Sequence, residues 1–556
     1  MLRALLPGAA AAPLPAATLS AAAFSTATGG SALDWLARFV NHEQRGVPAA
    51  AGTDSDAGFD LGRMRRLLAD VGEPQTAWPA VHVAGTKGKG STVAMLAAIL
   101  QAAGYRAGAY TSPHIRSLHE RLAVGGAPIA PAELDALVAR HAGAVEAAAQ
   151  RDGGGALSHF EILTALAYKL FQEQQVDAAV IEVGLGGVRD ATNVLPPASL
   201  AAAVITAVGH DHAAALGGSI KAIAAAKAGI MQAGRPVVLG RQPEAAAQAV
   251  LLRRAQELGC PVIHASEEVR FEPAGSEPGT SDGAAASGGA APQLRQRATM
   301  ALSGDTAAAL VGPGEAVQLD VSLRLLGAHQ LDNAAAAVAA AACLRRHGLD
   351  RIDLQAVAAG LEAATLPGRF QLCQFAQDAD VAAAAAAMTA QGGDAGGGSS
   401  SARAGQPGPW VVLDGAHTLE SAAALAQTLR AAFPTAPVAL VLAMAEDKQH
   451  RDICQALRTL HPVAAIFTGV PIAGGAARSA APGQLAAAWQ AAAILGGGRP
   501  RGGVRTRELI QASLTAAVER ARMELRAQRG ERGVVVVCGS LHAVGAVLAH
   551  LPLVPC

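Results

Sequence analysis

The stretch VHVAGTKGKGST, residues 81–92, decides how the rest of the chain is organised. A short apolar run ends at Gly85 and a helical segment begins near Gly88, so unpaired backbone N–H groups face one small space. That space suits a phosphate group, because Lys89 can reach outer phosphate oxygens and either Ser91 or Thr92 can add a hydroxyl to phosphate or to a bound cation. The stretch therefore predicts a nucleotide-binding loop. The simpler interpretation is an ordinary Gly-rich turn between a strand and a helix.

Composition excludes several classes of protein. The length of 556 residues allows two or three domains, each with its own core. Basic and acidic residues both number 44, so the net charge is zero and no nucleic-acid partner is expected. The six cysteines lack C-x-x-C spacing, which argues against a zinc knuckle or a disulfide framework. No apolar run is long enough to span a bilayer, so no membrane partner is expected.

Residues 1–30 resemble an organelle transit peptide. They contain Arg3, several Ser and Thr, abundant Ala and no acidic residue. Pro13 and Pro15 interrupt the apolar core that a secretory signal would need. The pattern favours the mitochondrial matrix as the location, with plastid and cytosol as the alternatives.

From residue 81 onward, apolar strand-like runs alternate with helical segments. The strand runs are continuously apolar, which is typical of a parallel sheet covered by helices on both faces. We therefore expect an α/β fold with a P-loop and a doubly wound, mostly parallel sheet, whose ligands sit at the carboxyl ends of the strands. The expected strands are 81–84, 106–110, 178–183, 202–206 and 236–239, and the expected helices are 32–44, 62–71, 91–103, 131–150, 159–174 and 219–231.

A second alternating series predicts a smaller, Rossmann-like C-terminal domain. It follows an alternating segment at 317–325 and a helix at 330–346. The expected domains are residues 31–366 and 367–556. Runs rich in Gly, Ala, Ser and Pro predict an insertion in each domain, at about 272–298 and about 377–409. The expected strands are 410–413, 438–443, 464–469 and 534–538, and the expected helices are 419–432 and 507–529.

Polar residues follow several expected strands, where ligands would sit. Ser112 follows one strand, although a serine there is often only a turn cap. Glu182 ends another, and a buried carboxylate needs a metal or a cation as its partner. His212 follows a third, although a lone histidine is more often structural. Lys227 lies on an apolar helix, where the simpler interpretation is a lysine whose stem runs along the surface.

Taken in order, these segments resemble the folylpolyglutamate synthase and dihydrofolate synthase family, relatives of the Mur ligases. The similarity covers nearly the whole chain after residue 55, and the string EVGLGG-x-x-DATN is close to diagnostic. The matching segments are GTKGKGST (85–92), TSPHI (111–115), ERLAVGG (120–126), SHFEILTALA (158–167), EVGLGGVRDATNV (182–194), HAAALGGSIKAIAAAKAGI (212–230), LLGAHQLDNAAAA (325–337), LPGRFQ (366–371), LDGAHTLES (413–421), EDK (446–448) and GSL (539–541).

The resemblance implies roles for individual residues. It implies that Ser112, Glu182 and His212 hold Mg²⁺, that Lys227 carries a carbamate serving a second Mg²⁺, and that a monovalent cation binds. The ATP-binding residues implied are Gly85, Thr86, Lys87, Gly88, Lys89, Gly90, Ser91, Asn333, Arg369 and Asp414. The catalytic residues implied are Lys89, Lys227, Asp414 and His417. The pteroate side is implied to be lined by Asp60, Leu61, Gly62, Arg63, Ser158, Arg189, Asp190 and Ala191.

The chain departs from the family pattern at several positions. Lys87 stands where many bacterial members have Asn, and Ala226 where many have Glu before the modified lysine. Thr418 replaces the Asn of the DGAHN form. Gly90 also separates this loop from the common spacing G-x-x-x-x-G-K-[ST].

The resemblance implies an ATP-dependent ligase that acts as a monomer on small molecules. The γ-phosphoryl group of ATP passes to a carboxylate, and the α-amine of L-glutamate then displaces phosphate to leave an amide. Because an acyl phosphate hydrolyses readily, the two domains are expected to close over it. The expected acceptor is dihydropteroate, since SHFE (158–161) and the 212–230 segment look like dihydrofolate synthases, those of plants above all. A reduced folate as acceptor, a bifunctional enzyme, an unrelated P-loop NTPase and an inactive homologue are the alternatives.

Overall fold

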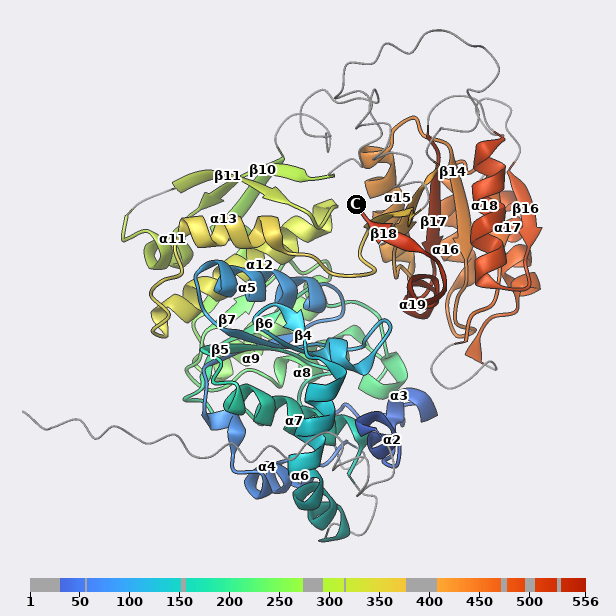
Figure 1. The fold of residues 1–556 in the computed structure, drawn as a ribbon. Coiled ribbons are helices and arrows are strands. Elements are labelled where there is room, and N and C mark those ends of the chain that lie inside the picture. The colour runs from blue at the N-terminus through green and yellow to red at the C-terminus, as the bar shows by residue number, and fades with distance from the viewer. Residues whose placement is uncertain are drawn as a thin grey trace, which may run out of the picture.

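The computed structural model describes residues 31–55, 58–151, 157–273, 294–314, 317–376, 408–471, 478–495, 506–527 and 532–556. The expected transit peptide at 1–30 and most of both expected insertions lie outside these residues. The described residues form two α/β parts that lie side by side (Figure 1). None of their helices combines the length and the apolar character needed to cross a bilayer.

The first part is built on an eight-stranded sheet in the order β4-β3-β2-β5-β1-β6-β7-β8. The six strands from β2 to β8 in this order run parallel, and β3 and β4 add an antiparallel edge. Every residue of β1, β5 and β6 is buried, which confirms the expected doubly wound sheet. The strands are β1 (Ala80–Ala84), β2 (Ala107–Tyr110), β3 (Leu122–Val124), β4 (Ala127–Pro128), β5 (Ala178–Glu182), β6 (Leu200–Ile205), β7 (Val237–Leu239) and β8 (Val262–His264).

Helices cover both faces of this sheet (Figure 1). One face packs against α5 (Lys89–Ala102), α12 (Ala328–Arg346) and α13 (Leu354–Ala363). At Gly360 of α13 a Cβ atom would lie 2.4 Å from Cα of Ile99, so this glycine allows α13 to approach α5 closely. The other face packs against α2 (Ala32–Leu36), α4 (Leu61–Asp70), α6 (Pro131–Arg151), α7 (His159–Glu173), α8 (Ile220–Ala228) and α9 (Ala245–Glu257).

A small antiparallel sheet, in the order β11-β10-β9, follows β8 in the chain. Of its three strands, only the last matches an expected segment, the alternating one at 317–325. Its strands are β9 (Val269–Pro273), β10 (Gln296–Leu302) and β11 (Val317–Leu323), accompanied by α10 (Ala265–Glu268) and α11 (Gly304–Leu310). The bounds expected for the first insertion, 272–298, are therefore wrong at both ends. Residues 272–273 belong to β9, and residues 296–298 belong to β10. Alternate residues of β10 are buried, and this alternation holds the strand on the core.

The second part contains a seven-stranded sheet in the order β16-β15-β14-β17-β13-β12-β18. The strands from β16 to β13 are parallel, whereas β12 runs antiparallel to both of its neighbours, β13 and β18. Helices α15, α16 and α17 pack on one face, and α18 and α19 on the other. The elements are β12 (Gln371–Phe375), β13 (Trp410–Leu413), α15 (Leu419–Ala432), β14 (Val438–Leu442), α16 (His450–Arg458), β15 (Ala464–Phe467), α17 (Pro482–Leu495), β16 (Arg507–Ile510), α18 (Leu514–Arg526), β17 (Val534–Cys538), α19 (Leu541–His550) and β18 (Leu553–Pro555).

Two expected helices are each divided in the structure. The segment 507–529 begins as strand β16 at the sheet edge, and α18 starts only after Ser513, whose side chain accepts a hydrogen bond from the N–H of Ala516. The segment 32–44 consists of α2 and the separate α3 (His42–Arg45), which Asn41 caps. In both cases a polar residue that caps the second element interrupts the apolar pattern.

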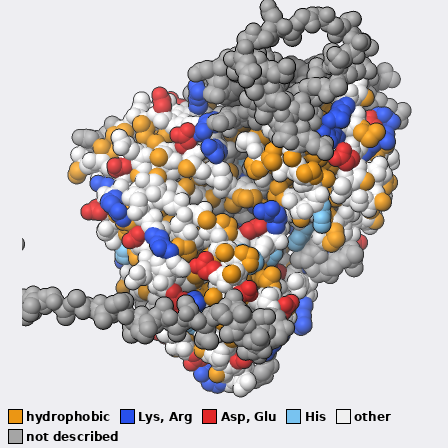
Figure 2. Space-filling view, in the orientation of Figure 1, with side chains coloured by type: hydrophobic (Ala, Val, Ile, Leu, Met, Phe, Trp, Pro, Cys, Tyr) orange, Lys and Arg blue, Asp and Glu red, His pale blue; other side chains and the backbone are white. Residues whose placement is uncertain are grey.

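The chain passes from the first part to the second between α13 and β12. The two parts touch where Gly545 of α19 meets the Ile115 carbonyl, because a Cβ at Gly545 would lie 2.2 Å from that oxygen. In the same orientation, Figure 2 shows histidine side chains together with acidic and basic ones near the junction of the two parts. The carboxyl ends of β1 and β5 and the segment after β13 supply the residues described next.

Candidate active site

The phosphate loop between β1 and α5 takes a shape that only glycine permits at two positions. Gly85 has φ of 150° and Gly88 has φ of 93°. A Cβ atom at Gly85 would lie 1.8 Å from Oγ1 of Thr206, and one at Gly88 would lie 2.1 Å from Oδ1 of Asn333. The structure therefore places Asn333, from α12, directly against the loop.

Backbone hydrogen bonds fix the loop to the segment after β6. The N–H groups of Thr86 and Lys87 both donate to the Ala207 carbonyl, at 2.8 and 3.2 Å. The Thr86 hydroxyl donates to the Gly209 carbonyl at 3.1 Å and accepts from the Gly209 N–H at 3.0 Å. The N-terminus of α5, where Lys89, Gly90 and Ser91 begin the helix, is thereby oriented by two neighbouring parallel strands.

Two lysine ammonium groups meet at one carbonyl oxygen of this loop. Nζ of Lys89 lies 3.3 Å from the Gly85 oxygen, and Nζ of Lys227 lies 2.8 Å from the same oxygen. Lys227 is only 5% exposed, so its interpretation as a surface lysine is wrong. Burial, reinforced by the charge of Lys89, lowers the pKa of Lys227 to about 7. A large fraction of its amine is therefore neutral near neutral pH.

Glu182, the last residue of β5, faces the same space. One of its oxygens lies 3.7 Å from Nζ of Lys89, and the other accepts from the N–H of Ser112 at 3.2 Å. Burial raises the pKa of Glu182, and Lys89 and the Ser112 N–H counteract this effect. The expectation that this strand-end carboxylate is buried beside a cation is thus met by Lys89.

Of the residues implied for magnesium, the structure brings Ser112 and Glu182 together. Within the described ranges, no three His, Cys, Asp or Glu side chains form a cluster that could hold a metal ion. The contact is made by the backbone N–H of Ser112; the carboxylate of Glu182 and the hydroxyl of Ser112 are oxygen ligands of the kind that suits Mg²⁺. His212 instead contacts Asp211: its backbone N–H donates to a carboxylate oxygen at 3.0 Å, and its Nε2 lies 3.9 Å from the same oxygen. Mg²⁺ commonly uses one or two protein ligands, with phosphate oxygens and water completing its shell.

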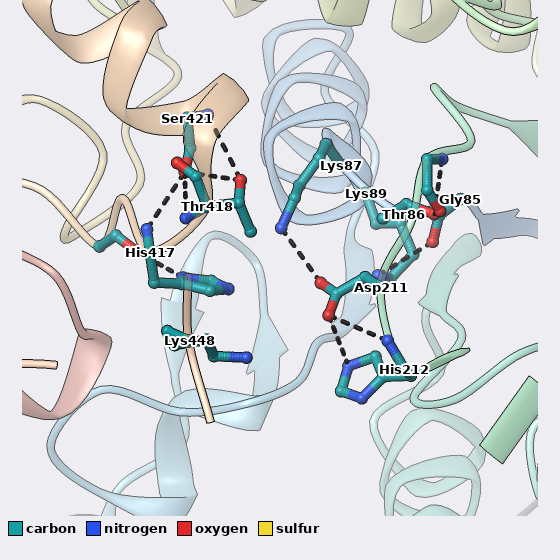
Figure 3. A network of polar contacts seen from close by, with 12 residues as sticks. Gly85, Thr86, Lys87, Lys89, Asp211, His212, His417, Thr418, Ser421 and Lys448 are labelled. Carbon is teal, nitrogen blue, oxygen red and sulfur yellow. Dashed lines mark hydrogen bonds and ion pairs between the residues drawn. The ribbon is translucent and has the colours of Figure 1, made fainter. Parts of the chain in front are cut away.

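The second part presents two further groups to the loop (Figure 3). Nζ of Lys87 donates to Asp211 at 3.1 Å, and His417 and Lys448 lie across from this pair. His417 Nδ1 is 2.7 Å from the Gly415 carbonyl, which can only accept, so Nδ1 carries the proton and Nε2 is free to accept one. Burial, with the charge of Lys87 added, lowers the pKa of His417 to about 4, so this imidazole is neutral.

Asp414 connects two turns of the second part, the one before β12 that contains Arg369 and the one after β13 that contains His417. The Asp414 carboxylate accepts from the N–H groups of Phe370 and Ala416, both at 2.8 Å. Burial raises the pKa of Asp414, and the Arg369 charge lowers the pKa of both Asp414 and Glu182. The Arg369 charge therefore acts on a carboxylate of each part. Because backbone donors occupy both oxygens of Asp414, this residue orders the turns that carry Arg369 and His417.

Some of the residues implied for the pteroate side do gather around one pocket. A pocket of about 350 Å³ is lined by Asp54, Asp60, Leu61, Gly62, Arg65, Val188, Arg189 and Asn193. Asp60 caps α4 by accepting from the Gly62 N–H at 2.7 Å. Arg189 lies on the facing loop and pairs with Asp54 at 2.9 Å. The pocket therefore combines carboxylates with a guanidinium group.

The remaining residues of that set have other partners. Arg63 and Ser158 both contact Glu161, the former at 3.3 Å and the latter through its N–H at 2.7 Å. Asp190 and Ala191 are buried and do not line this pocket. The Asp190 carboxylate accepts hydrogen bonds within its own loop, so this residue holds the loop in shape.

Sequence reasoning did not single out Lys448, or Asp211 as the partner of Lys87. Lys448 follows β14, so the rule that ligands gather at the carboxyl ends of strands could have found it. Reasoning also missed Arg121, which is 1% exposed and binds the Glu43 carboxylate through two nitrogens. The only feature of the sequence that could have indicated Arg121 is its charge within the otherwise mostly apolar segment ERLAVGG (120–126).

Comparisons with known proteins agree with this geometry. Residues 158–341 match the family described as the Mur ligase middle domain, and residues 402–541 match the family described as the Mur ligase, glutamate ligase domain. A dihydrofolate synthase/folylpolyglutamate synthase from Bacillus subtilis is 34% identical over 407 residues, which cover 72% of this chain and 79% of that protein.

Solved structures share the two-part architecture. The Mycobacterium tuberculosis folylpolyglutamate synthase complexed with ADP and AMPPCP superimposes with a TM-score of 0.66 and 29% identity, covering 88% of this chain and 95% of that one. An Escherichia coli FolC in complex with DHPP and ADP gives a TM-score of 0.65 and 25% identity, covering 94% of this chain and 97% of the other.

Proposed function

The chain belongs to the dihydrofolate synthase/folylpolyglutamate synthase family of ligases, and we propose that it joins L-glutamate to the carboxylate of 7,8-dihydropteroate, with ATP converted to ADP and phosphate. One observation carries this proposal: the phosphate loop, with Lys87 and Lys89, faces His417 and Lys448 of the second part (Figure 3). A kinase-like phosphoryl transfer needs only the groups of the phosphate loop, whereas an amide ligase also needs groups that receive an amine.

Phosphoryl transfer is assigned to the loop. Lys89 at the start of α5 neutralises the charge on the transferring group, and the helix N-terminus offers N–H donors to the phosphates. Arg369 adds a second cation from the opposite side. ATP thus lies between the two parts, with its γ-phosphoryl group directed at the acceptor carboxylate.

A magnesium ion would be held by Ser112 and Glu182, with His212 near the Lys87–Asp211 pair. When bound, it would offset negative charge on the phosphates. Lys227 has a buried amine that is partly neutral near pH 7, which is the form that reacts with CO₂ to give a carbamate. The carbamate would replace a positive charge with oxygen ligands for a second ion. A monovalent cation belongs to the same proposal.

The incoming glutamate is assigned to the second part. Nε2 of the neutral His417 can accept a proton from the attacking α-amine, since Nδ1 already donates to Gly415. Lys448 and Lys87 lie beside it and offer positive charge to the glutamate carboxylates. Attack of the amine on the acyl phosphate forms the amide bond and breaks the bond to phosphate.

The acceptor occupies the pocket near Asp60 and Arg189. A dihydropteroate presents a benzoate carboxylate, whereas a folate presents a γ-carboxylate several bonds further out, so one pocket depth cannot suit both equally. The SHFE segment supports dihydropteroate. Folylpolyglutamate synthesis and a bifunctional enzyme are the alternatives within the same family. A mitochondrial location and a monomeric state complete the proposal, the former because of the composition of residues 1–30.

The test offers the purified protein dihydropteroate and tetrahydrofolate in separate reactions, each with ATP and glutamate, and identifies the products by mass. We expect dihydrofolate from the first reaction and glutamate-dependent release of ADP. Extension of tetrahydrofolate with no product from dihydropteroate would replace the acceptor assignment, and ADP release independent of glutamate would overturn the ligase assignment.

A further inference from the structure

A histidine lies in the centre of the first sheet, where an apolar side chain would be expected. His82 is the middle residue of β1, opposite Ile181 of β5 and Ala203 of β6, and it is 0% exposed. The other residues of β1 are Ala and Val. Burial lowers the pKa of His82 to about 3, so the ring is neutral at any pH at which the protein functions. A buried polar ring has to be stabilised by its hydrogen bonds.

Among the described residues, the His82 ring makes one hydrogen bond, which leads to the loop after β5 that carries Arg189. Its Nε2 lies 2.8 Å from Oγ1 of Thr192, and its Nδ1 has no hydrogen-bond partner among the described residues. Thr192 in turn donates its hydroxyl proton to Asp190, which also accepts from the N–H groups of Thr192 and Leu185, at 3.0 and 2.7 Å. Tyr168 donates to the Thr192 carbonyl at 3.0 Å.

The direction of these hydrogen bonds follows from the carboxylate of Asp190, at which they end. Burial raises the pKa of Asp190, and the hydrogen bonds that it accepts counteract this effect. Both carboxylate oxygens accept a backbone N–H, Oδ1 that of Thr192 and Oδ2 that of Leu185, and this arrangement suits a carboxylate that only accepts. The Thr192 hydroxyl proton therefore points to Asp190, and the lone pair of that hydroxyl receives the proton on Nε2 of His82. This fixes the tautomer of His82 as the one protonated at Nε2, with Nδ1 bare.

The chain of bonds connects the two substrate regions. Three residues after His82, directly after the end of the strand, stands Gly85, whose carbonyl oxygen contacts Lys89 and Lys227. One residue before Asp190 is Arg189, which lines the acceptor pocket and pairs with Asp54. We propose that His82 is a positioning residue, which through Thr192 and Asp190 holds the Arg189 loop in fixed register with the phosphate loop. This inference rests on the proposed function, and it assigns the network to binding of the acceptor and not of ATP.

The test compares variants that differ only in the network. Thr192→Val keeps the shape and removes the hydroxyl, whereas Thr192→Ser keeps the hydroxyl. In Thr192→Val the KM for the acceptor should rise about tenfold, with the KM for ATP changed less than about twofold, and Thr192→Ser should restore the acceptor KM. His82→Gln, which keeps a donor near the Nε2 position, should retain more acceptor affinity than His82→Asn, which offers one near Nδ1.

A measurement on the wild-type chain covers the case in which a variant does not fold. Nitrogen-15 NMR of the histidine rings should show His82 protonated at Nε2 and unchanged between pH 5 and pH 8. Protonation at Nδ1, an unchanged acceptor KM in Thr192→Val, or an equal rise of both KM values would overturn the proposal. This test uses whichever acceptor substrate the wild-type protein accepts. An error in the acceptor assignment would therefore show separately, as a different product in the mass analysis.

Discussion

Lys89 is the residue whose charge the phosphate loop uses most directly. We expect Lys89→Ala to lower ADP formation by at least about 100-fold, because the ammonium group that offsets charge on the transferring phosphoryl group is lost. Lys221→Ala is the matched control, since Lys221 is an exposed lysine on α8 and should keep wild-type activity. The measurement is the initial rate of ADP release, with circular dichroism to compare the folds. Wild-type turnover in folded Lys89→Ala would remove this lysine from the mechanism.

The carbamate proposed for Lys227 predicts how the recovery of activity depends on pH. Arginine keeps a charge but cannot form the carbamate, so Lys227→Arg should lose activity by about 100-fold or more, comparable to the loss of a directly acting group. The neutral amine increases as pH rises through about 7, so removal of CO₂ should inactivate the protein and added bicarbonate should restore it faster at pH 8 than at pH 6. Lys221→Arg is the control. Full activity of Lys227→Arg would contradict the carbamate.

At the residue scale, the sequence predicted those site residues that stand at strand ends or in a glycine pattern. Glu182 ends a buried strand, and the glycines around Lys89 mark the loop. Reasoning from sequence missed His82 because a histidine in an apolar run carries no sign of its partner, which lies 110 positions away in the chain. Arg121 was missed for the same reason, because Glu43 lies on a different element.

At the element scale, the turn from β1 into α5 requires a left-handed residue. Gly88 has φ of 93°, and a Cβ there would lie 2.1 Å from Asn333. We expect Gly88→Ala to abolish measurable ATP binding in a nucleotide titration. The control is Gly143→Ala, in the exposed interior of α6 with no atom within 4 Å of the added Cβ, which should bind ATP normally and gain about 0.5–1 kcal/mol in unfolding free energy. Normal ATP binding in Gly88→Ala would contradict the loop geometry.

Elements with a strong, local pattern agreed with expectation, and those set by distant contacts did not. The strands 410–413 and 534–538 and the helix 419–432 match β13, β17 and α15 residue for residue. By contrast, β16 contains Arg507 and Glu508 and is a strand because β15 pairs with it. Its own composition resembles the helix that follows, so only the tertiary pairing identifies it.

At the scale of the whole molecule, the site depends on contact between the two parts. Gly545 of α19 leaves no room for a Cβ against the Ile115 carbonyl, at 2.2 Å. Alanine favours a helix over glycine by about 1 kcal/mol, so Gly545→Ala should not weaken α19 itself but should push the two parts apart. We expect kcat to fall about tenfold or more, since small displacements of catalytic groups have large effects.

Gly483→Ala is the control for this change, because it adds a Cβ to α17 of the same part with no atom within 4 Å. Small-angle X-ray scattering should show a larger radius of gyration for Gly545→Ala than for the control. Equal kcat values in the two variants would show that this contact does not govern the arrangement of the site.

The central claim is that the loop of the first part and the groups of the second act on one acyl phosphate. The most direct measurement supplies dihydropteroate labelled with ¹⁸O in both carboxylate oxygens, together with ATP and glutamate, and analyses the released phosphate by mass. Attack of the carboxylate on the γ-phosphoryl group followed by amide formation leaves one carboxylate oxygen in the phosphate. We therefore predict one ¹⁸O in each phosphate released. Unlabelled phosphate accompanying amide formation or ADP release would contradict the account.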